Sequence, residues 1–271
     1  IHEGQLDRRR AVGKLVNLSD LLVHEPLAGK SGIGHTRWAT HGAPSVVNAH
    51  PHLAGPVAVV HNGIIENFRE LRAELSAKGV KFVSETDTET VALLTQQHMS
   101  EGLDPIEAAT KTIKRLHGAF ALALLFDGES DLMIGARKGA PLAVGYGDNE
   151  MFLGSDAIAL SPMTDRLTYL EEGDMAILRR ASVEIYDTHG QLANRAIRTI
   201  SLDNTRVNKD GHKHFMAKEI AEQPSVIGAA LSQYLTADGQ IVLPDPGLDF
   251  TAIDRITMVA CGTAFYACLT A

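Results

Sequence analysis

The fold of this chain is decided by residues 57–79, which read VAVVHNGIIENFRELRAELSAKG. The β-branched run at 57–60 predicts a buried strand. It is followed by His61-Asn62-Gly63, and a turn is predicted there because Asn and Gly tolerate positive φ angles. We therefore expect a strand that ends at a polar corner.

The second half of this stretch predicts a helix. Asn67 and Glu70 have the spacing of a capping box, and Phe68, Leu71 and Leu75 recur on one helical face. Gly79 is the expected stop.

Further along the chain, the same reasoning predicts two more helices and then a series of short strands. The helices are expected over 86–102 and from Asp104-Pro105 to 116, where Glu107 follows the cap by three residues. The strands are expected at 119–126, 132–136, 141–144, 151–154, 175–178 and 183–186. Strands so closely spaced pair antiparallel, so the predicted class is α+β, with helices outside sheets.

The pattern changes after residue 200. The polar, aperiodic run SLDNTRVNKDG at 201–211 predicts a linker, and 217–234 predicts a helix that Pro224 kinks or restarts. An apolar strand at 256–260 followed by a glycine turn and a helix is the expected opening of an α/β unit. We thus expect domains at 1–202 and 212–271, joined by a linker at 203–211.

Composition excludes several classes of protein. Of 271 residues, 45% are hydrophobic and 21% are charged, as in ordinary globular proteins. The formal net charge of −8 leaves no overall basic footprint, so no nucleic-acid partner is expected. No apolar run approaches the ~18 residues of a membrane helix, so no membrane partner is expected.

The two cysteines, Cys261 and Cys268, are too few for a disulfide framework or a zinc ribbon, and they fit a reducing, cytoplasmic location. The chain begins with Ile1 and stops at Ala271 inside an apolar pattern, so we interpret it as a fragment. No cofactor is expected.

Five histidines at positions 35, 41, 50, 52 and 61 invite a metal-site interpretation. Their spacing does not favour it, because no HExxH motif or acidic ligand pair accompanies them. A hydrogen-bonding scaffold is the stronger interpretation, and no metal is expected.

Four polar phrases mark the candidate site: HTRWATHG at 35–42, NAHPH at 48–52, HNGIIEN at 61–67 and SETDTE at 84–89. Arg37 offers a planar fork for a carboxylate, and Asp87 offers an anion for an ammonium group. Asn62 and the backbone N–H of Gly63 are two donors that can converge on an oxyanion. Taken singly, Arg37 also fits a surface ion pair, Asp87 a helix cap, and Asn62-Gly63 a plain turn.

Together, the phrases resemble the glutaminase domain of the class II glutamine amidotransferases, in particular its hexosamine-forming branch. The resemblance continues through EEGD at 171–174 and KEIAEQP at 218–224 to the ACGT turn at 260–263, where the branch's sugar-isomerase (SIS) half begins. It implies an Ntn-hydrolase αββα sandwich of two antiparallel sheets, followed by the start of an SIS domain.

The implied activity is hydrolysis of glutamine to glutamate and ammonia, with ammonia delivered to fructose 6-phosphate to form glucosamine 6-phosphate. Matched by motif position, Arg37 and Thr40 would bind the glutamine carboxylate and Asp87 its ammonium. His41 would line the glutamine pocket, and Asn62 and Gly63 would form the oxyanion hole. Trp38 would gate the passage of ammonia, Thr263 would bind the sugar phosphate, and the full-length protein would be a homodimer.

Two departures from the family pattern stand out. The implied nucleophile is an N-terminal cysteine that this chain lacks, so the chain itself is expected to be inactive. Ala264 stands where a serine commonly follows Thr263. Two alternatives stay open from the residues alone: a non-catalytic glutamine sensor built on Arg37 and Asp87, and an amidotransferase with another acceptor.

Overall fold

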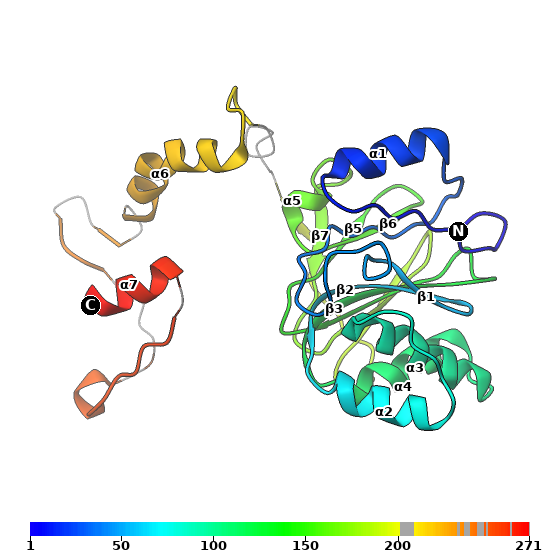
Figure 1. Cartoon of the computed structure of the whole chain (residues 1–271). Coiled ribbons are helices and arrows are strands. Elements are labelled where there is room, and N and C mark those ends of the chain that lie inside the picture. Colours follow the sequence, from blue (N-terminus) through cyan, green and yellow to red (C-terminus); the bar gives the residue numbers. More distant parts are fainter. Residues whose placement is uncertain are drawn as a thin grey trace. The chain divides into compact units, whose positions relative to one another are not determined.

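The structure is a computed structural model that describes residues 1–200, 209–231, 234–235, 239–242, 247, 249–260 and 262–270. The chain forms two compact units, Ile1–Asp203 and Asn204–Ala271 (Figure 1). Each unit is described by itself below.

The first unit contains two antiparallel sheets. The larger has six strands in the order β1 (His52–Ala54), β2 (Val57–Ile65), β3 (Gly118–Phe126), β4 (Met133–Lys138), β8 (Met175–Leu178) and β9 (Val183–Tyr186). The smaller has four, in the order β10 (Arg198–Thr199), β7 (Arg166–Tyr169), β5 (Ala143–Tyr146) and β6 (Met151–Gly154). The predicted antiparallel pairing is confirmed, whereas β1, β7 and β10 were not predicted.

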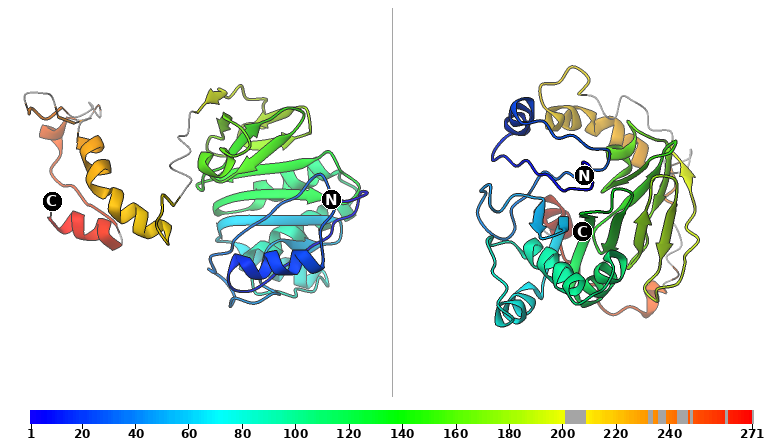
Figure 2. Two further views of the ribbon diagram at one scale, coloured as in Figure 1. Left: turned by 90° about the horizontal axis from the view of Figure 1, so that it is seen from above. Right: turned by 90° about the vertical axis from the view of Figure 1, so that its right-hand side faces the viewer.

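The helices of this unit are α1 (Leu15–His24), α2 (Phe68–Ala77), α3 (Asp87–Ser100), α4 (Pro105–Arg115) and α5 (Ala157–Leu160). Helices α2, α3 and α4 lie together on one side of the larger sheet (Figures 1 and 2). The three helices predicted between residues 67 and 116 are therefore confirmed, while α1 and α5 were not predicted.

Side-chain alternation along the central strand β3 separates two of the apolar cores. Phe120, Leu122 and Leu124 pack toward α2, α3 and α4, whereas Ala121 faces the smaller sheet. This is the two-residue period of a strand buried on both faces. A third cluster packs α5 against the outer face of the smaller sheet through Leu160 and Leu167. The layers therefore run helix, sheet, sheet, helix, and the predicted α+β class is confirmed.

The capping predictions have opposite outcomes. Asp104 caps α4 as expected: its Oδ1 accepts from the N–H groups of Ile106 and Glu107, at 2.9 Å each. The capping box predicted at Asn67 is wrong. The Asn67 side chain instead donates to the Arg115 carbonyl at 2.9 Å and accepts from His117 N–H at 2.9 Å. A tertiary contact thus takes the side chain that the local pattern assigned to the helix.

The turn predicted at residues 61–63 is also wrong, because β2 continues to Ile65. Asn62 pairs with Ala121 and Gly63 with Phe120. Gly63 has φ +126°, and a Cβ there would lie 2.1 Å from the Ala119 carbonyl oxygen. Only glycine fits this strand position.

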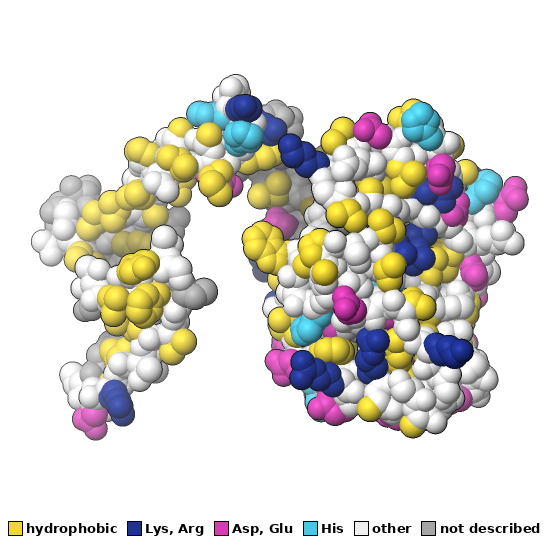
Figure 3. Space-filling view, in the orientation of Figure 1, with side chains coloured by type: hydrophobic (Ala, Val, Ile, Leu, Met, Phe, Trp, Pro, Cys, Tyr) yellow, Lys and Arg dark blue, Asp and Glu magenta, His cyan; other side chains and the backbone are white. Residues whose placement is uncertain are grey.

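The second unit contains α6 (Phe215–Leu231), a short 3-10 helix η2 (Phe250–Ala252) and α7 (Gly262–Thr270). The predicted helix over 217–234 is confirmed in its main part, and it runs through Pro224. Apolar side chains of α6, including Met216 and Ile220, are exposed on its surface (Figure 3).

The strand predicted at 256–260 is wrong, since these residues pair with no strand in the described part of the chain, and the α/β opening is not seen. The predicted linker at 203–211 lies outside the described residues except for its last three positions. None of the helices in the described ranges is long and apolar enough to cross a bilayer.

Gly63→Ala tests the strand geometry. The left-handed φ costs roughly 1–2 kcal/mol for an L-residue, and the clash with Ala119 adds about 1–3 kcal/mol of overpacking. Urea denaturation should therefore show a loss of about 3 kcal/mol in the free energy of unfolding.

Gly79→Ala is the matched control, because Gly79 has φ +86° but no atom within 4 Å of the position of a new Cβ. It should cost only about 1 kcal/mol. Equal losses of unfolding free energy in the two variants would show that Ala119 moves away from the new Cβ. The close contact at Gly63 would then not affect stability.

Candidate functional site

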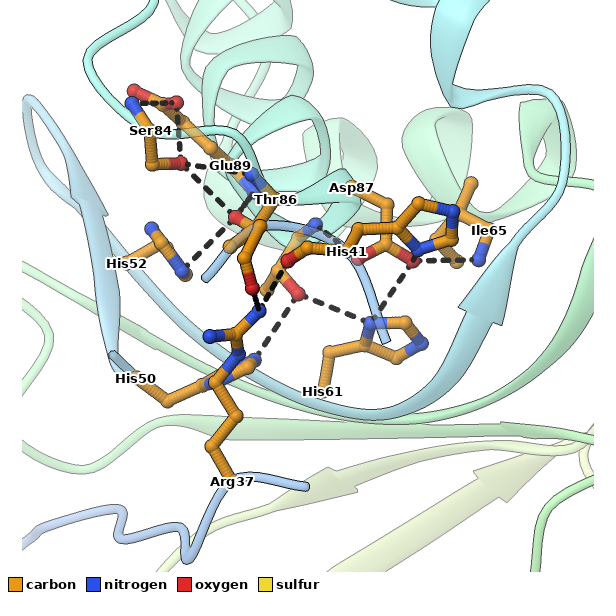
Figure 4. Close-up of polar contacts among 12 residues, drawn as sticks. Arg37, His41, His50, His52, His61, Ile65, Ser84, Thr86, Asp87 and Glu89 are labelled. Carbon is orange, nitrogen blue, oxygen red and sulfur yellow. Dashed lines mark hydrogen bonds and ion pairs between the residues drawn. The ribbon is translucent and has the colours of Figure 1, made fainter. Parts of the chain in front are cut away.

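The site is built where the first turn of α3 meets the open edge of β2 (Figure 4). Strand β1 pairs with β2 only as far as Val59. Beyond that point, Asp87 Oδ2 accepts a hydrogen bond from Ile65 N–H at 2.9 Å. Thr86, not Asp87, is the N-cap of α3, because its hydroxyl accepts from Glu89 N–H at 3.3 Å. The helix-cap interpretation of Asp87 is therefore wrong, and its carboxylate is buried beside the strand edge.

Threonine hydroxyls of this turn hold three of the histidines. Thr88 Oγ1 lies 3.1 Å from His50 Nε2 and 3.1 Å from His61 Nδ1. Thr86 Oγ1 lies 3.0 Å from His52 Nε2. All five residues are buried, so the interpretation of these histidines as a hydrogen-bonding scaffold is confirmed.

Burial keeps the three histidines neutral near pH 7. Desolvation lowers the pKa of His50 to about 2, with the neighbouring His35 ring adding to the effect. It lowers the pKa of His52 to about 3 and that of His61 to about 4, although the Asp87 carboxylate opposes the shift at His61. These three histidines therefore add no positive charge beside Asp87 near pH 7.

Asn62 and Gly63 lie next to each other on β2, between His61 and Ile65. Successive N–H groups of a strand point to opposite edges, so Gly63 N–H points the same way as Ile65 N–H, toward α3. Asn62 is exposed.

Arg37 neither forms the surface ion pair considered above nor lies free. Its guanidinium donates to the carbonyls of His41, Gly42 and Ala43. These bonds fix the loop that carries the exposed Thr40. Trp38, the residue after Arg37, has an exposed fraction of 90%.

His41 packs its ring edge-on against Phe68, with 4.8 Å between ring centroids. Its Nδ1 lies 4.0 Å from Asp87 Oδ2, the same oxygen that accepts from Ile65 N–H (Figure 4).

A cavity of about 320 Å³ joins these groups. It brings together Arg37, Trp38, Thr40, Asn62, Gly63 and Asp87, six of the eight predicted site residues. His41 contacts Asp87 without lining this cavity. Thr263 lies exposed in the first turn of α7, in the second unit.

Sequence reasoning missed Thr86, Thr88 and Glu89, although all three belong to the quoted phrase SETDTE. The Glu89 carboxylate is buried and accepts from Val83 N–H at 2.8 Å and from Ser84 N–H at 2.7 Å. The signal was present in the alternation of hydroxyl and acidic residues at a helix start, which is typical of capping. Among the described residues, no group of three or more His, Cys, Asp or Glu side chains is placed to hold a metal ion.

Acid should unfold this unit through the buried histidines. The unfolded chain binds protons near pH ~6.5, whereas His50, His52 and His61 bind them only at much lower pH. The free energy of unfolding is therefore not reduced by these groups above about pH 6.5. It falls by about 1.4 kcal/mol per pH unit per histidine as the pH drops toward 4. Urea denaturation at about pH 7 and about pH 5 measures the slope.

His52→Gln should reduce that slope by the share of one histidine, and the exposed His189→Gln is the control that should leave it as in the parent protein. A pH slope unaffected by His52→Gln would contradict the assignment of His52 as a neutral buried group.

The chain is similar in sequence to known proteins. Residues 42–162 match the family model described as "Glutamine amidotransferase domain". The chain is 56% identical over 268 residues to a glutamine–fructose-6-phosphate aminotransferase [isomerizing] of Zymomonas mobilis, covering 98% of this chain and 44% of that protein. It is 55% identical to the protein of the same name from Brucella abortus, with the same coverage. The chain thus spans less than half the length of these curated relatives.

Among solved structures, the glutamine phosphoribosylpyrophosphate amidotransferase of B. subtilis is similar, with a TM-score of 0.50 at 24% identity over 58% of this chain and 35% of that one. This likeness concerns the fold alone and agrees with the Ntn-hydrolase sandwich implied by the sequence. Residues 42–162 therefore match the glutamine amidotransferase domain family, within a chain that is similar along nearly its whole length to glutamine–fructose-6-phosphate aminotransferases.

Proposed function

We propose that this chain provides the glutamine site of an enzyme that hydrolyses glutamine and transfers the ammonia to fructose 6-phosphate, forming glutamate and glucosamine 6-phosphate. The observation that carries the proposal is one cavity lined by Arg37, Asp87 and the donors at Asn62 and Gly63. The names of the relatives, which are similar over 98% of this chain, supply the reaction.

Asp87 suits the ammonium group of the substrate. It is a buried carboxylate whose ion-pair partners in the described part of the chain are two histidines, His41 at 4.0 Å and His61 at 3.8 Å. His61 is neutral, since its pKa lies at about 4. A buried anion without a Lys or Arg partner gains from a cationic ligand, because desolvation strengthens the attraction.

Arg37 and Thr40 suit the substrate carboxylate. A guanidinium has five N–H donors. Loop carbonyls bond to Nη1 and Nη2. Within the described ranges, no loop bond uses Nε–H, which is left to donate to a carboxylate. The loop bonds hold the guanidinium in place before the substrate arrives, which lowers the entropy cost of binding.

The chemistry then requires a nucleophile at the substrate's carboxamide carbon. A thiolate attacks this carbon, the carbonyl oxygen becomes an oxyanion, and Asn62 Nδ2 and Gly63 N–H receive it. Collapse of the intermediate expels ammonia and leaves a thioester that water hydrolyses to glutamate. The class uses an N-terminal cysteine with its own amino group as base, and the first unit of this chain contains no cysteine.

The remaining roles follow from the resemblance. His41 would line the glutamine pocket beside Asp87, and Trp38 would gate the passage of ammonia. Thr263, with the N–H groups of the first turn of α7, would bind the sugar phosphate, since helix N-termini bind anions. We infer a cytoplasmic homodimer, with neither nucleic acid nor membrane as partner.

Arg37→Ala tests the substrate clamp in the product of the complete gene, assayed for ammonia release from glutamine and for synthesis from free ammonia. Loss of a hydrogen bond to a charged group, worth about 1.5–3 kcal/mol, should raise the glutamine KM about tenfold or more. Synthesis from ammonia should survive, because that route bypasses the glutamine site.

Asn48→Ala is the matched control. Asn48 Nδ2 donates to the Ala43 carbonyl at 3.0 Å, so this variant also loosens the loop, but Asn48 does not line the cavity. An equal rise in KM for both variants would assign Arg37 to the loop alone. A parent protein that releases no ammonia from glutamine would overturn the proposed function.

Asn62→Ala tests the oxyanion hole. Removing one preorganised donor should lower kcat for glutamine hydrolysis by roughly 10² to 10³, with little change in KM. Asn62→Asp, which keeps the shape but replaces the donor by an acceptor, should be at least as slow.

The exposed Asn17→Ala serves as the control and should keep the parental kcat. A raised KM with kcat retained would reassign Asn62 to binding of the ground state.

A further inference from the structure

Two side chains of α3 replace a strand along the open edge of β2. Strand β1 leaves this edge after Val59. From there, the edge contacts α3 at His61, through Thr88 at 3.1 Å, and at Ile65, through Asp87 at 2.9 Å. Asn62 and Gly63 lie between these two anchors.

The Thr88 hydroxyl contacts two histidine rings at once. A hydroxyl has one donor and two acceptor sites, and Thr88 Oγ1 contacts His50 Nε2 and His61 Nδ1, each at 3.1 Å. The other ring nitrogens, His50 Nδ1 and His61 Nε2, are buried without a hydrogen-bond partner in the described ranges. Within those ranges, each of the two rings therefore has one hydrogen-bond partner, the Thr88 hydroxyl.

We propose that Thr88 is a positioning residue for the oxyanion donors Asn62 and Gly63: its hydroxyl clasps His50 and His61 and so fixes the strand segment that presents these donors. The inference rests on the proposed function. An oxyanion hole works only when its donors are held within about 0.5 Å of the productive geometry. The clasp supplies that restraint on the side of the edge that no strand covers.

The clasp should affect catalysis more than binding. The Asp87 carboxylate has its own backbone anchors, Ile65 N–H at 2.9 Å and Thr88 N–H at 3.0 Å, and neither involves the Thr88 side chain. The substrate's ammonium partner therefore stays in place when the hydroxyl is removed. The donors at Asn62 and Gly63 keep their pairing with β3 but lose one of the two α3 contacts that flank them.

The test compares Thr88→Val with Thr88→Ser in the product of the complete gene. Valine keeps the volume and removes the hydroxyl, so kcat for glutamine hydrolysis should fall about tenfold or more while KM stays within about threefold. Serine keeps the hydroxyl and should restore kcat to within about threefold of the parent.

Thr112→Val is the matched control. Thr112 is buried, and its hydroxyl bonds His98 Nδ1 at 3.1 Å and Thr95 Oγ1 at 3.1 Å, the same chemistry away from the cavity. This variant should lose stability as Thr88→Val does, yet keep both kcat and KM.

Three results would overturn the proposal: an unchanged kcat in Thr88→Val, a rise in KM as large as the fall in kcat, or a similar fall in kcat in Thr112→Val. A parent protein without glutaminase activity would instead overturn the proposed function. In that case, nitrogen NMR of the His50 and His61 rings tests directly whether the Thr88 hydroxyl bonds to both rings. Their signals should change in Thr88→Val, and unchanged signals would show that no clasp exists.

Discussion

The contact on which the site depends is the hydrogen bond from Ile65 N–H to the Asp87 carboxylate. An unpaired N–H on a buried strand edge costs free energy comparable to a lost hydrogen bond. Strand β1 is too short to cover this edge, and the first turn of α3 covers it instead. The same contact buries Asp87 beside the strand that carries Gly63. One hydrogen bond therefore both pairs the Ile65 N–H and positions the carboxylate of the site.

The neutral histidines around Asp87 follow from this burial. Three charged imidazolium groups in such a space would repel one another and lose their hydration. Held neutral, they satisfy the hydroxyls of Thr86 and Thr88 without cancelling the charge of Asp87. The result is a polar wall in which the Asp87 carboxylate faces the cavity and suits an amino-acid ammonium group.

The opposite wall of the cavity is held in a different way. Arg37 donates to carbonyls of its own loop, so a segment without regular secondary structure gains the order that helices and strands supply elsewhere. The loop bonds use only part of the guanidinium. A site that fixes its anion through a helix start and its cation through loop carbonyls places both charges before any ligand is present.

Local sequence patterns were enough to predict the helices α2, α3 and α4, the antiparallel strands from β3 to β9 apart from β7, and six site residues that line the cavity. These features depend on residues close together in the chain: apolar periodicity, the capping box at Asp104, and turn residues between strands. Tertiary structure alone decided that Asn62 and Gly63 lie within a strand and that Asn67 bonds to residues 115 and 117. It also decided that Thr88 joins two histidines. In each of these cases the partner is distant in sequence, and the free energy of a hydrogen bond depends on that partner's position, which no local pattern contains.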